Sequence, residues 1–339
     1  MTREPLSVDL ALQGGGAHGA FTWGVLDRLL EEDWLKIEGI SGTSAGAMNA
    51  AALIAGYVEG GPKVARETLE LFWRRVSDAG RLSPLQRNPL DVMLGRWTLD
   101  TSPVFIASDL MSRLVSPYDL NPQGVNPLRR ILAEVIDFEK IARAPISIFV
   151  TATNVSTGRA RVFRNRDLSP DALLASACLP TMFQAIEIED ELYWDGGYSG
   201  NPTITPLVRE CVSRDTILVQ INPIVRTERP RTATDIANRL NEVSFNAVLL
   251  KELRMIALLR QTADPGDCEG ARWAGMRIHR ISSELMTALS ASSKLLAEWE
   301  FLCMLRDEGR RAAGAFLDFH SADIGKCSTF DLDALLEGI

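Results

Sequence analysis

The chain contains little cysteine and histidine, with five and three residues respectively in a total of 339. The cysteines are odd in number, widely separated and without the spacing of metal ligands; they are Cys178, Cys211, Cys268, Cys303 and Cys327. This pattern predicts reduced thiols in a cytoplasmic protein, and we expect no bound metal.

A long apolar run is also missing. The nearest candidate, from Ala45 to Val58, is interrupted by Asn49 and two glycines, so we interpret it as a buried helix. The first residues, MTREPLSVDLALQGGG, contain no apolar core long enough for a signal peptide. We therefore expect neither a transmembrane helix nor a leader, and any membrane contact would be peripheral.

Positive charge is not in excess. With 36 basic and 44 acidic residues, the net charge is -8, which argues against nucleic acid as a partner and against electrostatic docking on anionic lipid. The composition, 46% apolar and 24% charged, is that of an ordinary globular protein. The length predicts one large domain with an appendage, or two domains.

The first part of the chain alternates between short apolar runs and helical periodicity. A strand at 6–12, a glycine loop at 14–19, a helix at 20–33, a strand at 37–41 and a helix from residue 45 predict a βαβα order and hence a parallel sheet covered by helices. Further strands are predicted at 146–152, 160–163, 185–188, 192–194 and 216–221.

Two segments depart from this alternation. Residues 81–124 are rich in proline, asparagine, serine and large apolar side chains, and we interpret them as an insertion or lid over the sheet. After residue 225 the pattern changes to amphipathic helices at 233–262 and 283–319, separated by a loop-like stretch at 263–275. We predict an α/β domain at 1–225 and a helical extension at 226–339 packed on it.

The first motif is Gly14-Gly15-Gly16-Ala17-His18-Gly19, between a strand and a helix. Glycines let backbone N–H groups approach a negative atom beside a helix N-terminus, so the loop predicts an anion site. One candidate anion is the pyrophosphate of a dinucleotide, with Glu38 as a ribose ligand, because the loop also fits G-x-G-x-x-G. The other is the oxyanion of an acyl-transfer reaction.

The second motif is Gly42-Thr43-Ser44-Ala45-Gly46, which fits G-x-S-x-G. It follows a short strand and precedes a helix, as a nucleophile elbow requires, with small residues on both sides so that the turn can close. Ser44 is therefore the candidate nucleophile, and the pair of motifs favours an oxyanion over a pyrophosphate.

A nucleophilic serine needs a base, and histidine is the usual one. His18 lies inside the glycine loop, whereas His279 and His320 lie in the C-terminal region with no motif around either. The chain order of an α/β-hydrolase triad is formally available, but there the serine usually follows several strands, and Ser44 follows only two. The alternative base is Asp195, at a predicted strand end in Tyr193-Trp194-Asp195-Gly196-Gly197.

The ordered set Gly-Gly-Gly-x-x-Gly, Gly-x-Ser-x-Gly and Asp-Gly-Gly resembles the patatin-like phospholipase family over roughly residues 6–225, and the block from Ala175 to Pro180 resembles a further motif of that family. The resemblance implies a three-layer α/β/α fold with a mostly parallel central sheet and a Ser44/Asp195 dyad in place of a triad. It also implies an oxyanion hole from Gly14, Gly15 and Gly16, and no metal or organic cofactor. The elbow and supporting residues are then Gly42, Gly46, His18, Gly196 and Gly197.

The chain departs from the family pattern at two positions. Members often have arginine where this chain has His18, and aspartate or a similar residue where it has Gln13. Histidine carries only a partial charge near neutral pH, whereas arginine is always charged. A preference for phosphate headgroups is therefore in question, while the glycine spacing is intact.

The predicted function is hydrolysis of a lipid or other acyl ester through an acyl-enzyme. An apolar slot, a lid or a contact with a lipid surface could come from the insertion, although its side chains could equally be core; they are Leu90, Met93, Leu94, Trp97, Phe105, Ile106, Leu110, Met111 and Leu114. Alternatives are an acyltransferase or thioesterase on the same dyad, a non-catalytic lipid- or protein-binding module, and a nucleotide-binding oxidoreductase. The sequence carries no signal for an oligomeric state.

Overall fold

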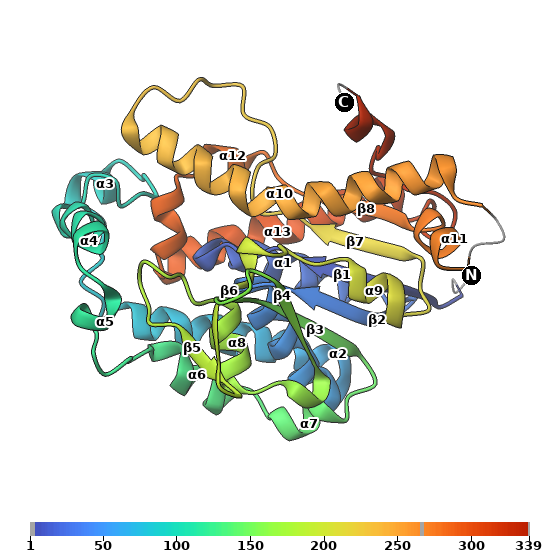
Figure 1. Ribbon diagram of the computed structural model, residues 1–339, viewed down its shortest axis with the longest axis horizontal. Coiled ribbons are helices and arrows are strands. Elements are labelled where there is room, and N and C mark those ends of the chain that lie inside the picture. The colour runs from blue at the N-terminus through green and yellow to red at the C-terminus, as the bar shows by residue number, and fades with distance from the viewer. Residues whose placement is uncertain (1–3, 265–267, 338–339) are drawn as a thin grey trace.

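The computed structural model describes residues 4–264 and 268–337. Its centre is a sheet in the order β5-β6-β3-β2-β1-β7-β8, with β4 paired to β3 (Figure 1). Neighbouring strands run parallel from β3 to β8 along this order, and β4, β5 and β6 are antiparallel to their partners. The strands are β1 Leu6–Leu12, β2 Leu35–Gly42, β3 Ser147–Asn154, β4 Ala160–Arg164, β5 Ile186–Ile188, β6 Glu191–Asp195, β7 Asp215–Val219 and β8 Arg277–Ile281.

Helices cover both faces of the sheet, because apolar side chains leave each strand on both sides. In β1, Leu10 and Leu12 pack into one hydrophobic cluster and Ala11 into the other. The first cluster contains residues of α1 Gly19–Leu29, α2 Ala45–Gly80, α6 Pro127–Val135, α7 Phe138–Ala142, α8 Pro170–Ser176 and α13 Trp299–His320. The second contains residues of α9 Thr205–Glu210, α10 Ala233–Thr262 and α11 Cys268–Ala274. The predicted three-layer α/β/α fold with a mostly parallel sheet is confirmed.

The C-terminal region differs in detail from the expected pair of helices. It adds β8 to the sheet, beside β7, and α11 lies where a loop was expected. The expected helix at 283–319 is three elements: α12 Leu285–Ala288, the 3-10 turn η4 Ala291–Leu295, and α13. β8 has five residues and owes its extended form to pairing with β7, which local periodicity does not reveal. The division of the chain at residues 225 and 226 stays a prediction.

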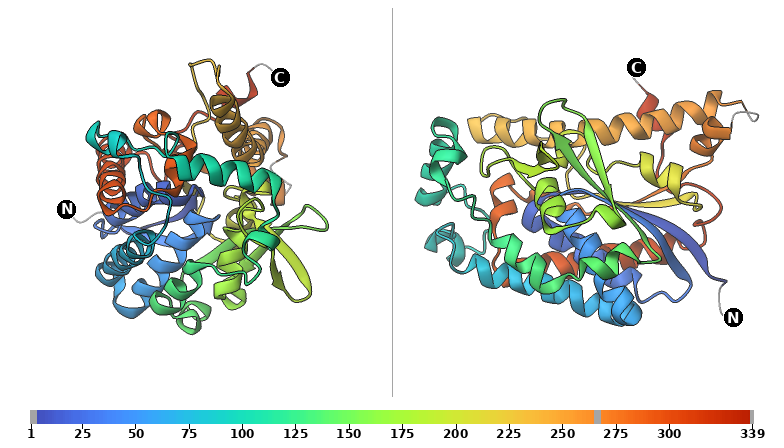
Figure 2. Two further views of the ribbon diagram at one scale, coloured as in Figure 1. Left: turned by 90° about the vertical axis from the view of Figure 1, so that its left-hand side faces the viewer. Right: turned by 60° about the horizontal axis from the view of Figure 1, so that its bottom comes forward.

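The insertion forms three short helices, α3 Pro89–Met93, α4 Pro103–Leu114 and α5 Pro117–Leu120, each with proline at its start. They project at one end of the molecule (Figures 1 and 2). Trp97 and Phe105 pack partly against the core. The other predicted apolar residues of the segment are exposed, so they are not core: Leu90, Met93, Leu94, Ile106, Leu110, Met111 and Leu114. Among the described residues, no helix combines the length and apolar character needed to cross a membrane.

Candidate active site

Strand register brings the predicted motifs together. Leu12 of β1 lies opposite Gly42 of β2, so the glycine loop and the G-x-S-x-G turn leave the sheet at the same edge. On β3, Ala152 lies two residues beyond the partner of Gly42, and Asp195 of β6 lies opposite Ala152. Asp195 therefore reaches the level of Ser44 at the carboxyl ends of the parallel strands, where ligands bind in open α/β sheets.

Ser44 occupies a strained turn between β2 and α2. Its φ of 53° and ψ of -122° lie outside the regions that non-glycine residues favour, as expected where surrounding structure fixes an unusual conformation at a functional site. Gly42 ends β2, and a Cβ on Gly46 would lie 2.2 Å from the carbonyl oxygen of Leu12, so only glycine fits there. The amide of Ser44 donates a hydrogen bond of 2.9 Å to Ser176 Oγ, which holds the turn from the side of α8.

Asp195 is buried at the end of β6, and its carboxylate interacts with the Ser44 side chain. Its Oδ1 accepts the amide of Gly197 at 2.7 Å, within the 3-10 turn η3 Gly196–Tyr198. Burial raises the pKa of Asp195 from its ordinary 3.8 to about 7, although the Gly197 amide, Ser44 and the charge of Lys294 act in the opposite direction. A carboxylate with this pKa can exchange protons near neutral pH.

The glycine loop offers fewer free donors than predicted. The Gly14 amide donates to Asn201 Oδ1 at 2.7 Å, so this N–H is already used. The Gly15 and Gly16 amides have no acceptor recorded among the described residues. Of the three predicted oxyanion donors, these two are the ones available in this structure.

His18 is buried behind the glycine loop. Its Nε2 lies 2.7 Å from Ser293 Oγ, and its ring packs against Phe301. Burial lowers the pKa of His18 well below its usual value, and the positive charge of Lys294 lowers it further. The ring is therefore neutral near pH 7, and its recorded contacts support the loop rather than the serine.

The other two histidines lie away from Ser44. His279 Nε2 is 3.1 Å from Asp215 Oδ1 on the neighbouring strand, and His320 Nδ1 is 3.1 Å from Asp323 Oδ2 beyond the end of α13. The formal Ser-Asp-His triad is therefore not assembled among the described residues, and the carboxylate that interacts with Ser44 is that of Asp195.

Glu38, the ribose ligand of the dinucleotide alternative, is not placed to bind a ribose beside the glycine loop. Glu38 lies beside the first half of β1, whereas the glycine loop follows the end of that strand. Its carboxylate accepts the amides of Val212 at 2.5 Å and Ser213 at 3.0 Å, and is thus occupied as a loop cap. Within 4–264 and 268–337, no cluster of three or more histidine, cysteine, aspartate or glutamate side chains is arranged to hold a metal.

Several residues around the site were not predicted. Ser176 lies in the block that resembles a family motif, so its position could have been suspected, but Asn201, Asn222 and Lys294 have no local signal. Gln13, the second departure from the family pattern, accepts the amides of Ile221 at 2.9 Å and Asn222 at 2.8 Å, which ties the loop to the end of β7.

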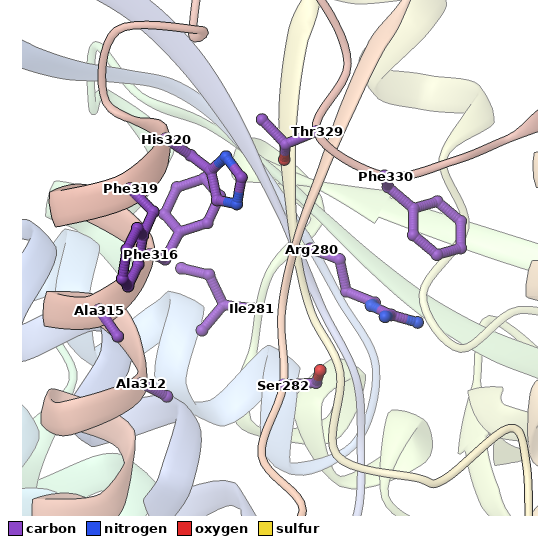
Figure 3. Close-up of a pocket in the computed structure, with 10 residues that line it drawn as sticks. All are labelled: Arg280, Ile281, Ser282, Ala312, Ala315, Phe316, Phe319, His320, Thr329 and Phe330. Atoms are coloured by element: carbon purple, nitrogen blue, oxygen red, sulfur yellow. The ribbon is translucent and has the colours of Figure 1, made fainter.

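Two recesses differ in their relation to the dyad. One of about 280 Å³ lies where α13, β8 and residues 329–330 meet, and contains none of the predicted site residues (Figure 3). In that view Ile281 points toward Phe316 and His320, whereas Arg280 points toward Phe330. A smaller recess adjoins the glycine loop and is lined in part by His18, Asn222 and Lys294.

Of the comparisons with known proteins, the one with family models supports the resemblance that the motifs indicate. A search of curated proteins found no match. Among solved structures, VipD from Legionella pneumophila is similar at 15% identity with a TM-score of 0.42, over 94% of this chain and 67% of that one. The family model described as patatin-like phospholipase matches residues 10–208, more than half of the chain. The chain therefore belongs to the patatin-like phospholipase family.

Proposed function

We propose that this protein hydrolyses the carboxylic ester bond of a lipid, with Ser44 as nucleophile and Asp195 as general base and acid. Membership of the family supports lipid acyl hydrolysis in general. The observation that carries the finer proposal is that the side chain of Ser44, on its strained turn, interacts with the buried carboxylate of Asp195. A carboxylate with a pKa of about 7 is much better matched to taking the serine proton than one near 4.

The reaction follows from this arrangement. Asp195 accepts the Ser44 proton as Oγ attacks the ester carbonyl carbon, and the carbonyl electrons move to oxygen. The Gly15 and Gly16 amides stabilise that oxyanion, each by about 3 kcal/mol by analogy with other such donors. Protonated Asp195 then gives its proton to the departing alcohol. Water, deprotonated by the same carboxylate, attacks the acyl-enzyme and releases the acid and free Ser44.

Access for the lipid is proposed through the insertion. Leu99 of this segment donates its amide to Ser292 Oγ at 3.0 Å, and the adjacent Ser293 contacts His18. The insertion is thus anchored near the glycine loop while most of its large apolar side chains face solvent. Exposed apolar surface of this kind is typical of lids and of lipid contacts. We propose that α3, α4 and α5 contact a lipid surface peripherally in a cytoplasmic protein.

The test compares ester hydrolysis by the wild type, Ser44→Ala and Asp195→Asn, using p-nitrophenyl esters from short to long acyl chains. Each catalytic variant is expected to lose at least about a thousandfold in kcat, as for other nucleophile and partner substitutions. Fluorophosphonate labelling followed by mass spectrometry should place the label on Ser44. Ser156→Ala and Asp190→Asn, both at exposed positions, are the matched controls and should retain activity.

Activity retained by Ser44→Ala, or a label on another serine, would contradict the dyad. A folded wild type that neither hydrolyses nor labels would contradict the enzymatic function itself.

A further inference from the structure

Lys294 lies against the glycine loop although it comes from the C-terminal region. It belongs to η4, and its backbone packs on Gly16: a Cβ there would be 2.4 Å from the Lys294 carbonyl oxygen. Gly16 itself has a φ of 57°, which favours glycine. The backbone of the glycine loop therefore packs closely against the backbone of η4.

The Lys294 ammonium is held by neutral oxygens. Nζ donates to Asn222 Oδ1 at 2.8 Å and to Asn241 Oδ1 at 3.3 Å. Asn222 in turn donates from Nδ2 to the Gly14 carbonyl oxygen at 2.9 Å. A hydrogen-bonded path therefore runs from the cation to the loop that carries the candidate oxyanion donors.

No carboxylate among the described residues forms an ion pair with Lys294. Glu242 is the carboxylate whose charge raises the pKa of Lys294 most, but it is already paired with Arg226 at 2.6 Å and Arg239 at 3.1 Å. His18, which also lines the recess, is neutral. The field of the ammonium is thus not cancelled by a contacting anion, and it extends to Asp195, whose pKa it lowers.

We propose that Lys294 is an electrostatic positioning residue of the active site, acting on both Asp195 and the oxyanion. The inference rests on the proposed function. The site holds one negative charge at every stage, first on Asp195 and then on the carbonyl oxygen. A cation that is linked through Asn222 to the glycine loop and whose charge acts on Asp195 stabilises that negative charge as it moves to the carbonyl oxygen.

The proposal determines the shape of the pH profile. Burial lowers the pKa of Lys294 to about 8, against Glu242 and Asp195, which raise it, while Arg226 lowers it further. Asp195 must be ionised and Lys294 protonated in the active form. The profile of kcat/KM should therefore be a narrow bell, with its acid limb near the Asp195 pKa of about 7 and its alkaline limb near the Lys294 pKa of about 8.

The experiment measures kcat/KM for a soluble ester between about pH 5 and pH 10 in the wild type, Lys294→Met and Lys294→Arg. In Lys294→Met the alkaline limb should disappear, the acid limb should move to higher pH, and the maximum should fall at least about tenfold. Lys294→Arg should keep the acid limb and remain active above pH 8, because arginine does not lose its proton there. Lys251→Met, at an exposed position on α10, is the control.

A Lys294→Met profile of unchanged shape, lowered uniformly at every pH, would mean that the residue only supports the fold and would overturn the inference. Fluorophosphonate labelling of wild-type Ser44 separates the two proposals. If the wild type is neither labelled nor able to hydrolyse esters, both the proposed function and this inference are wrong. If the wild type does both, an unchanged shape of the Lys294→Met pH profile contradicts this inference alone.

Discussion

At the scale of single residues, the burial of Asp195 lowers the stability of the folded protein at the pH where the proposed function needs an ionised carboxylate. The unfolded chain releases this proton near pH 3.8, whereas the folded protein holds it to about pH 7. Between these values the folded state binds more protons than the unfolded state, so stability from this group falls as pH rises. A buried base of this kind opposes folding at the pH where it would work.

Asp195→Asn is therefore expected to raise the melting temperature while abolishing hydrolysis. Asparagine can keep the hydrogen bond from the Gly197 amide without a buried charge. The increase in melting temperature should be larger at pH 7.5 than at pH 5, because the free-energy cost of ionising the buried Asp195, which the substitution removes, grows over that interval. Thermal unfolding at both pH values checks this, and an equal gain at the two would refute the assignment of the raised pKa.

Ser176→Ala tests the support of the nucleophile turn. The change removes the acceptor of the Ser44 amide and leaves a poorly solvated N–H without a partner, which costs about 1–3 kcal/mol. We expect lower stability and a lower kcat with little change in KM.

Ser169→Ala is the matched control, because it removes the N-cap of the same helix, worth about 1 kcal/mol, without touching Ser44. An equal loss of kcat in both variants would show that α8 acts only through its stability.

At the scale of elements, an ionic cluster joins β7 to β8. Asp215 accepts hydrogen bonds from Arg277 at 2.5 Å and from the Gly325 amide at 2.9 Å, and contacts His279. Burial raises the pKa of Asp215, but the bonds from Arg277 and His279 lower it more, so the net shift is downward from 3.8. Its stabilising effect is fully present at neutral pH and is lost as pH falls below about 4.

Asp215→Asn should consequently destabilise the protein by about 3 kcal/mol at pH 7, because it leaves Arg277 without its charged partner. The difference from wild type should shrink toward pH 3. Asp78→Asn, which breaks an exposed pair with Arg81, should change stability by less than about 1 kcal/mol. Chemical denaturation at both pH values measures each effect, and a pH-independent loss would argue against the ionic account.

At the scale of the whole molecule, the exposed insertion allows the proposed lipid contact to be tested separately from the proposed chemistry. The double variant Leu110→Glu/Leu114→Glu places charge on side chains that are 57% and 72% exposed. It should weaken co-sedimentation with phosphatidylcholine vesicles and lower hydrolysis of long-chain esters, since burying a charge in lipid is costly. Hydrolysis of a soluble short-chain ester should not change.

Val212→Glu is the control, because this side chain is 86% exposed and lies outside the insertion. Equal losses on vesicles and on the soluble ester would instead mean that the double variant damages the site or the fold.

The sequence by itself determined features that depend on neighbouring residues. Alternating apolar residues specify most strands, glycines specify where backbones approach, and the G-x-S-x-G pentapeptide specifies a turn that places a serine before a helix. The three-layer fold could be inferred because a βαβα order leaves few ways of covering both faces of a sheet.

Only the tertiary structure decided which of these groups touch. Ser176, Asn201 and Lys294 reach the site from positions 132 to 278 residues away from Ser44 or Gly16, through strand register and the packing of η4. Contacts between distant loops also bring Asn201 Oδ1 to the Gly14 amide, and strand pairing places β8 beside β7. These outcomes depend on contacts between distant segments, and no local pattern encodes them, because hydrogen-bond geometry and burial exist only once the chain has folded.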